Sequence, residues 1–363
     1  MSGVISIDGD NYNVGKNLGR FWGNYFTHLR GSKQKRHKAL YSDYKRWLSD
    51  NRDDKKSFVK QKLVKDYFPD IWNEIEGMLE GVNESEIGFK PTVGGLFACC
   101  LAESDLSWRS YNGCSTTVLR TDDAYVMVHS DEYESPVPLV ATNVTLRKQK
   151  SKVDFFSISH PFQLLGSAAG FNKWFAIQGN SIGCDKETFA AGERRMPKTI
   201  FSRILLEEAT PQAVAALYEK FPCSLPNHHV IVAPHGVFSL EVRPGERGHG
   251  MNGVRLIEKT LEPGGKKFNH TNHFRDDEIH SRWSYNDKIQ NESALRLRLL
   301  KQYVKNANDI LTLEKAFNSF AHNYEPTKGK PVHHTMSGIF TFVVKAKGQP
   351  ELRSISFSYG AGP

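Results

Sequence analysis

The spacing of hydrophobic residues changes near residue 113 and divides the chain into a helical and a strand-rich part. Before this point, apolar positions recur at helical spacing over 13–26 and 71–79, and the second pattern ends at Gly81, as a helix stop would. After it come short runs rich in Val, Thr, Phe and Tyr, separated by Asp-Asp, Pro or charged breaks. We expect strands at 114–119, 124–129, 137–145 and 153–159.

The rest of the chain returns to helices and then to strands. A helix is predicted over 197–208, and another begins at Thr210, an N-cap followed by Pro211 at the first helical position. A strongly periodic helix is predicted over 291–304. This order of elements predicts a layered α+β fold. Further strands are expected at 228–234 and 236–242, joined by a turn around His235 and Gly236, and at 338–346 and 352–359.

The composition is that of an ordinary globular protein. The 363 residues are 39% hydrophobic and 24% charged, with 29 Gly and 16 Pro spread along the chain, which argues against fibrous and disordered classes. At roughly 150 residues per domain, the length allows two modest domains or one large layered one. Since no stretch approaches 18 uninterrupted apolar residues, we expect no membrane span.

The net charge of +8 comes from one basic segment. Between Arg30 and Lys65, thirteen Lys or Arg residues stand against four Asp, so the remaining residues are close to neutral. Apolar residues in the same segment have the spacing of amphipathic helices with a charged outer face. We therefore expect a solvated helical surface, with a patch that binds RNA or lipid as the alternative.

The start of the chain and its cysteines predict a reducing, cytoplasmic setting. The first 26 residues lack an apolar core behind a basic stretch, so no signal peptide is expected. The five cysteines are odd in number and lack CxxC spacing, which argues against a disulfide framework and a zinc ribbon. Cys99 and Cys100 lie in an apolar context and are predicted to be helix core. The others are Cys114, Cys184 and Cys223.

Gly113-Cys114 is the stretch most suggestive of chemistry, because it follows the loop 108–112 and opens a predicted strand. A self-cleaving precursor carries its nucleophile at such a position. The thiol attacks the preceding carbonyl, the flexible glycine admits the geometry required, and hydrolysis of the ester frees the amine. That amine, with a reference pKa of about 8, then serves as the base for its own thiol. The alternative is an ordinary half-buried strand cysteine.

Other catalytic signatures are missing from the sequence. It has no GxGxxG opening a helix and no Walker lysine, which argues against dinucleotide and P-loop chemistry. His270 and His273, with His333-His334, are the histidines to consider as metal ligands, but no acidic third ligand or HExxH spacing accompanies them. We expect neither a metal nor a cofactor.

A series of short motifs occurs in the same order as in one known family. They are Tyr12-x-x-Gly-x-x-x-Gly19, Glu74–Val82, Gly113–Thr116, Val128–Tyr133, Gly170–Lys173, Gly179–Ile182, Lys198–Glu207, Pro226–His229, Asn269–Phe274 and Glu292–Arg298. Through this ordered set the sequence resembles the acyl-coenzyme A:6-aminopenicillanic acid acyltransferase group of cysteine N-terminal nucleophile (Ntn) hydrolases, also called peptidase family C45.

The resemblance implies a nucleophile and a carboxylate partner. Cys114 would be the nucleophile, and the bond between Gly113 and Cys114 the cleavage site. Glu132 stands where the family has an aspartate that orients the new amine, and the neighbouring Asp131 is the alternative partner. Glu132 departs from the family pattern by one methylene group.

The resemblance also implies contacts to substrate and oxyanion. Asn180 and Asn227 would be amide donors for the oxyanion, with Asn227 preferred; the alternative for each is a turn residue that bonds its own backbone. His129 and Ser130 replace the family's usual Gln or Arg and its Asn.

Ser293 and Arg296 match a Ser-x-x-Arg motif on a helix. In that motif Arg296 would anchor the precursor loop or a substrate carboxylate. The alternative, for Arg296 as for Arg298, is a solvated helix face.

The fold implied by the resemblance is an αββα four-layer Ntn-hydrolase sandwich with an N-terminal helical segment. Residues 1–113 would form the small subunit and residues 114–363 the catalytic core. The implied function is hydrolysis of a linear amide, an N-acyl amine or amino-acid conjugate, through a Cys114 acyl-enzyme. Acyl transfer from a thioester or amide to an amine is the close alternative. The partners of the enzyme would be the small-molecule substrate and its own small subunit. We expect no nucleic-acid partner, and assembly into a higher homo-oligomer is an open alternative.

Three alternative hypotheses compete with this predicted function. A papain-like enzyme would use an internal cysteine with a separate histidine, such as His270, as base. A non-enzymatic binding protein would use the basic segment 30–65. A degenerate family member, suggested by His129, Ser130 and Glu132, would fold without cleaving.

Overall fold

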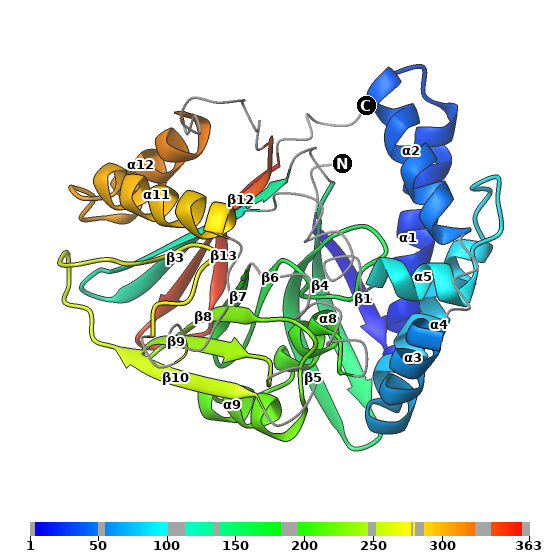
Figure 1. The fold of residues 1–363 in the computed structure, drawn as a ribbon, viewed down its shortest axis with the longest axis horizontal. Helices are drawn as coiled ribbons and strands as arrows, with labels where there is room; N and C mark the ends of the chain where they lie inside the picture. The colour runs from blue at the N-terminus through cyan, green and yellow to red at the C-terminus, as the bar shows by residue number, and fades with distance from the viewer. Residues whose placement is uncertain are drawn as a thin grey trace.

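Two β-sheets pack face to face between two layers of helices in the computed structural model (Figure 1), which is the αββα sandwich expected. Loop 108–112, Cys184 and His333-His334 lie outside the described residues. The structure describes residues 4–49, 55–100, 113–133, 138–182, 195–245, 252–276, 279, 287–323 and 335–357.

The larger sheet, sheet A, has eight strands within the described residues. Neighbouring strands are antiparallel, apart from the parallel pair β1 and β4 at one edge. Their order is β1 (Val4–Gly9), β4 (Val140–Lys148), β5 (Ser151–Ser159), β6 (Ala169–Asn172), β7 (Ala176–Ser181), β8 (Asn227–Ala233), β9 (Gly236–Arg243) and β10 (Gly253–Lys259).

In the part of the chain that the structure describes, the smaller sheet, sheet B, has five antiparallel strands. Because β2 lies between β11 and β3, Cys114, its second residue, belongs to an interior strand rather than an edge strand. The order is β11 (Phe268–His270), β2 (Gly113–Arg120), β3 (Ala124–Tyr133), β12 (Thr335–Lys345) and β13 (Glu351–Phe357).

Helices cover the outer face of each sheet. The predicted cap at Thr210 is confirmed, since its side chain accepts a hydrogen bond from the backbone N–H of Ala213 and Pro211 opens the helix. Sheet A carries α1 (Asn11–Gly31), α2 (Lys35–Leu48), α3 (Lys55–Tyr67), α4 (Pro69–Asn83), α5 (Val93–Cys100), α8 (Lys198–Leu205) and α9 (Pro211–Lys220), and sheet B carries α11 (Asp287–Tyr303) and α12 (Ile310–Asn323).

Strand alternation decides which side chains meet between the sheets. On β2, Val118 packs in the core between the sheets, whereas its neighbour Leu119 packs beneath α11 and α12. On β8, Val230 faces sheet B and Ile231 faces the helices on sheet A. The same alternation therefore assigns each polar residue of these strands to one face.

Two of the family motifs meet as a helix–helix contact. Gly15 and Gly19 of α1 and Gly77 and Gly81 of α4 allow the two backbones to touch, because a Cβ atom at any of them would overlap backbone atoms of the partner helix. The motif glycines near the N-terminus thus serve packing.

A buried ion pair joins two further motifs. Arg203 of α8 donates to both carboxylate oxygens of Glu74 of α4, at 2.8 and 3.1 Å, and both side chains are fully buried. Arg203 also bonds Glu207 at 2.9 Å.

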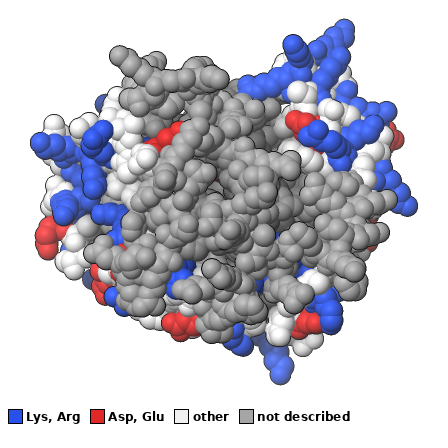
Figure 2. Space-filling view, viewed as in Figure 1, with Lys and Arg blue, Asp and Glu red and all other residues white. Residues whose placement is uncertain are grey.

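The basic segment forms helices with a charged outer face, as predicted. In α2, Tyr44 and Leu48 are buried, whereas its Lys and Arg residues are exposed. Figure 2 shows Lys and Arg side chains gathered at the corner that α2 occupies in Figure 1. Cys99 and Cys100 are buried in α5, which confirms that prediction. No helix in the described part of the chain is long and apolar enough to span a bilayer.

Candidate active site

Cys114 faces the space between the two sheets. It pairs with Asp131 across β2 and β3, and its side chain lies on the same face as that of Val118. Its backbone N–H donates to Oδ1 of Asn272 at 2.9 Å, and its Sγ lies 3.8 Å from Oδ1 of Asp131. Both ends of the proposed nucleophile, nitrogen and sulfur, therefore contact a polar side chain.

Asn272 fixes the position of the Cys114 nitrogen. Its Oδ1 also accepts from Nη2 of Arg296 at 2.8 Å, and its Nδ2 donates to the carbonyl of Ser181 at 2.6 Å. Its backbone N–H donates to Oγ of Ser293 at 2.7 Å. Asn272 lies within the Asn269–Phe274 motif, but the sequence did not predict a role for it. Its place in that motif was the sequence signal that could have identified it as a site residue.

Glu132 and Arg296 form a buried ion pair on the other face of sheet B, beneath α11. Nη1 of Arg296 donates to Oε2 of Glu132 at 2.8 Å. Oε1 of Glu132 accepts from the hydroxyls of Ser115 and Ser130 at 3.1 and 2.8 Å. Arg298 is exposed, so the solvated-face alternative holds for Arg298 and not for Arg296.

Gly113 leaves room for neighbouring side chains and has no unusual backbone conformation. A Cβ atom there would overlap Nη1 of Arg296 and approach Oε2 of Glu132. Its φ is not among the positive values found in the described residues, so the flexibility expected of this glycine is not what the fold uses. The absence of a side chain admits the guanidinium next to the proposed cleavage site.

Asp131 links Cys114 to His160, which the sequence did not single out. Oδ2 of Asp131 lies 2.8 Å from Nε2 of His160, and both side chains are almost fully buried. The other ring nitrogen of His160 lies 3.2 Å from Oγ of Ser167. His160 directly follows β5 and belongs to no motif, so no local signal marked it.

His129 and Asn180 extend the polar layer between the sheets. Nδ1 of His129 lies 2.8 Å from Oγ1 of Thr116, whose hydroxyl donates to Oδ1 of Asn180 at 3.3 Å. Burial lowers the pKa of His129 to about 4, so the ring is neutral at pH 7. Oδ1 of Asn180 also accepts from Gln178 at 2.8 Å, while its buried Nδ2 has no hydrogen-bond partner among the described residues.

Comparison with known families decides what kind of protein carries this cluster. The family model for acyl-coenzyme A:6-aminopenicillanic acid acyl-transferase matches residues 112–348, well over half of the chain. The chain belongs to this family. It is therefore an enzyme of the acyltransferase or Ntn-hydrolase type, and the match begins one residue before Gly113. No curated protein matches the chain.

In this family member, Asn227 lies apart from Cys114. It occupies the face of β8 that packs against the helices, where its Nδ2 donates to the hydroxyl of Tyr218 at 3.2 Å and lies 2.6 Å from Nε2 of His229. Since alternate residues of a strand face opposite ways, this side chain points away from the space between the sheets. The structure brings Asn180, and not Asn227, to that space.

Ser293 supports the segment that carries Asn272. Besides accepting from the Asn272 backbone, its Oγ lies 2.8 Å from Nδ1 of His273 and donates to Thr271 at 2.9 Å. Ser293 and Arg296, one turn apart on α11, thus hold Asn272 from two directions.

A second polar cluster lies further along the same layer. The rings of His228 and His270 stack with their centroids 3.3 Å apart, and Nε2 of His270 lies 3.6 Å from Oε1 of Glu241. Glu241 also accepts from the backbone N–H groups of Arg275 and Asp276. These contacts hold His270 on His228 and Glu241.

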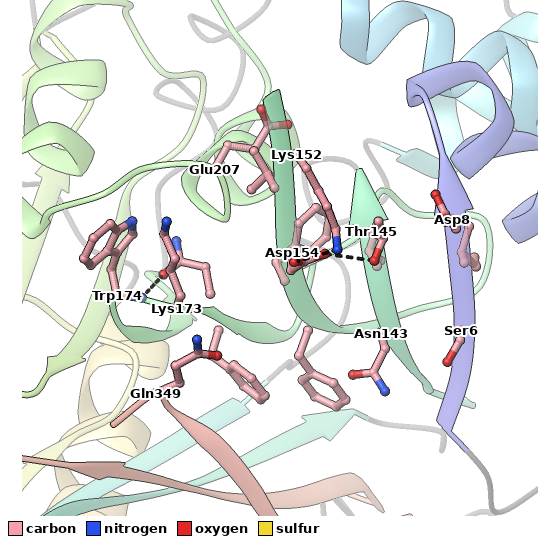
Figure 3. A pocket seen from close by; sticks show the side chains of 17 residues that line it. Ser6, Asp8, Asn143, Thr145, Lys152, Asp154, Lys173, Trp174, Glu207 and Gln349 are labelled. Carbon is pink, nitrogen blue, oxygen red and sulfur yellow. Dashed lines mark hydrogen bonds and ion pairs between the residues drawn. The ribbon is translucent and has the colours of Figure 1, made fainter. Parts of the chain in front are cut away.

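A cavity of about 710 Å³ opens at the opposite end of the sandwich from Cys114. Figure 3 shows Asn143 of β4, Trp174 and Gln349 around it, and Gln349 lies in the β12–β13 turn, beyond the end of β12 that pairs with Ala124. None of the described residues that line it belongs to the cluster around Cys114.

Proposed function

We propose that this enzyme cleaves its own chain between Gly113 and Cys114 and then hydrolyses a linear amide, with Cys114 as its N-terminal nucleophile. The observation that carries the proposal is the 2.9 Å bond between the Cys114 nitrogen and Oδ1 of Asn272. The same oxygen would accept a hydrogen bond from the amine that cleavage frees. Residues 1–113 would then be the small subunit and residues 114–363 the large one.

The self-cleavage step follows from the atoms that surround Cys114. Sγ attacks the carbonyl carbon of Gly113, the C–N bond breaks, and the thiol proton passes to the departing nitrogen. Water then hydrolyses the thioester, leaving a carboxylate on Gly113 and a free thiol and amine on Cys114. Asp131, 3.8 Å from Sγ and bonded to His160, is the group we assign to proton movement at the sulfur.

Catalysis on a substrate uses the same nucleophile, with the α-amine that cleavage frees as its base. Sγ attacks the amide carbonyl, the α-amine takes the thiol proton and delivers it to the leaving amine, and water releases the acyl group. We assign the oxyanion to Asn180, because its unpartnered Nδ2 faces the space between the sheets whereas the amide of Asn227 is bonded to Tyr218. Arg296 and Glu132 position Asn272, and through it the Cys114 nitrogen.

Acyl transfer to an amine is the second candidate, favoured by the description of the family itself. Both reactions share one acyl-enzyme and differ only in the acceptor. Adding a primary amine to an acyl-amine substrate and following the products by mass spectrometry separates them. A new amide that grows with amine concentration identifies a transferase, and release of free acid alone identifies a hydrolase.

The intact mass of the purified chain tests self-cleavage. We expect two fragments, 1–113 and 114–363, and a single uncut chain for Cys114→Ala. The matched control is Cys223→Ala, another buried cysteine whose pKa burial raises to about 12, so its thiol stays protonated; this variant should cleave normally. An uncut wild-type chain that also hydrolyses no acyl-amine would overturn the proposal and favour the degenerate member.

A further inference from the structure

Three different kinds of metal ligand converge on one face of sheet B. Cys114, His129 and Asp131 offer sulfur, nitrogen and oxygen, and one donor atom of each lies within 4.8 Å of the other two. They meet because Cys114 pairs with Asp131 across β2 and β3, and His129 lies two residues along β3 on the same face. We propose that these three residues bind a thiophilic divalent cation, of which Zn²⁺ is the type, and that the bound metal blocks the nucleophile.

Each of the two β3 ligands already has one polar atom held by a neighbouring side chain. Oγ1 of Thr116 lies 2.8 Å from Nδ1 of His129, and Nε2 of His160 lies 2.8 Å from Oδ2 of Asp131. These contacts leave Nε2 of His129 and Oδ1 of Asp131, and Oδ1 is the oxygen 3.8 Å from Sγ. Outer partners of this kind orient the ligands of protein metal sites.

The protonation states also suit a metal. A metal binds the neutral form of an imidazole, and Nδ1 of the buried His129 ring lies against the neutral hydroxyl of Thr116. Coordination removes the proton of the Cys114 thiol, which passes to the buffer, and the thiolate becomes the softest of the three ligands.

The ligand atoms need to move only a short distance to reach the separations of a zinc site. Zn²⁺ binds sulfur at about 2.3 Å and nitrogen or oxygen at about 2.0–2.2 Å, so the ligand atoms of a tetrahedral site lie about 3.3–3.6 Å apart. The Sγ to Oδ1 distance of 3.8 Å is near this value, and one donor atom of each residue lies within 4.8 Å of the other two. Side-chain rotation of about 1 Å therefore completes three ligands and leaves the fourth position to water.

A competing cluster in the same layer is less suited to a single ion. His228, Glu241 and His270 also place donor atoms within 4.8 Å of one another. The two rings, however, are stacked at 11° with centroids 3.3 Å apart, and their nitrogen lone pairs lie in the ring planes. One ion cannot lie in both parallel planes, so this second cluster serves as an internal control.

The consequence for activity rests on the proposed function. A sulfur bound to Zn²⁺ is not free to attack the Gly113 carbonyl in the uncut chain, nor a substrate amide in the cleaved enzyme. Metal at this site would therefore arrest self-cleavage and inhibit turnover. A chelator that removes the metal would restore both activities.

Zinc binding by the metal-free full chain is the direct test. The chain, reduced and freed of metal, is titrated with Zn²⁺ in competition with a chromogenic chelator, and Co²⁺ reports a thiolate ligand by its charge-transfer absorption. We expect one high-affinity Zn²⁺ per chain. Removing a ligand with Cys114→Ser, His129→Gln or Asp131→Asn should weaken binding by more than the roughly 10–100-fold typical of losing an outer partner. His228→Gln and Cys223→Ser are the matched controls and should leave the affinity unchanged.

Two outcomes would overturn the metal site: unchanged affinity in all three ligand variants, or a loss in His228→Gln alone. Circular dichroism of each variant identifies any that fails to fold, and the near-isosteric Asp131→Asn then carries the comparison. Self-cleavage is scored separately by intact mass. A chain that cleaves but binds no zinc overturns only the metal site, and one that binds zinc through these ligands but never cleaves overturns only the proposed function.

Discussion

Two adjacent carboxylates of β3 lie on opposite faces of sheet B and contact different groups. Asp131 faces the sulfur of Cys114 and the ring of His160, whereas Glu132 faces Arg296. Strand alternation alone produces this division. The two candidates for the carboxylate partner therefore lie at different places: Asp131 lies at the sulfur of Cys114, and Glu132 is linked to Asn272 through Arg296.

The buried pair Arg203 and Glu74 should be among the most sensitive positions for stability. Arg203→Met leaves the carboxylate of Glu74 buried without its cation, and we expect a loss of about 3–5 kcal/mol in the free energy of unfolding. Urea denaturation followed by circular dichroism measures it. The double variant with Glu74→Leu should recover much of the loss, because neither charge is then buried.

An exposed pair on the same helical layer provides the comparison. Arg20 bonds Glu84 at the surface, so Arg20→Met should change the unfolding free energy little. Equal losses in Arg20→Met and Arg203→Met would show that burial is not what makes the inner pair important.

Part of the site was predictable from the sequence, because several of its residues lie in the family motifs. Cys114, Asp131, Glu132 and Arg296 lie in motifs, and the structure brings all four into one network. His160 was missed because its contact with Asp131 spans 29 residues and depends on how β5 packs opposite β3.

The contact between α1 and α4 depends on glycine at each crossing point. Gly77→Ala would place a methyl group against the carbonyl oxygen of Tyr12, a backbone atom that cannot rotate away. We expect a loss of about 1–3 kcal/mol in the free energy of unfolding, or more, because the helices must separate. Urea denaturation measures the change.

Gly31→Ala is the matched control for this substitution. Gly31 is the last residue of α1, and nothing lies within 4 Å of the Cβ position. Alanine there should leave stability within about 0.5 kcal/mol of the wild type or raise it slightly. A Gly77→Ala chain as stable as Gly31→Ala would contradict the close packing of α1 and α4.

Elements were predictable where the local pattern was strong and bounded. The strands near 114–119 and 124–129 and the helix after Thr210 were found because β-rich runs or a cap marked them. β1 was not predicted, since its six residues pair only with β4, more than 130 residues later. α12 was also missed.

Buried neutral histidines should make the stability of the whole molecule sensitive to mild acid. Burial lowers the pKa of His129 to about 4 and that of His229 to about 3, and it also lowers those of His228 and His270. In the unfolded chain these rings take up protons below about pH 6.5. Their stabilising contribution is thus complete above that pH and is lost as the pH falls toward the folded values, by about 1.4 kcal/mol per pH unit for each ring.

His229→Gln tests this dependence at one ring. Unfolding free energies from urea titrations between pH 7.5 and 5 should fall less steeply for this variant than for the wild type. His235→Gln, which removes an exposed ring at the β8–β9 turn, should keep the wild-type slope. Identical slopes in all three proteins would contradict the account.

The parallel pairing of β1 with β4 has a mechanical consequence. The proposed cut leaves β1 on one polypeptide and β4 on the other. Sheet A would then contain strands from two chains, joined by the six residue pairs between β1 and β4. The cut would break one peptide bond and leave the hydrogen bonds and packing between the two pieces in place. The two pieces should elute from a native gel-filtration column as one particle and part only in denaturant, and neither should refold alone into a complete sheet A.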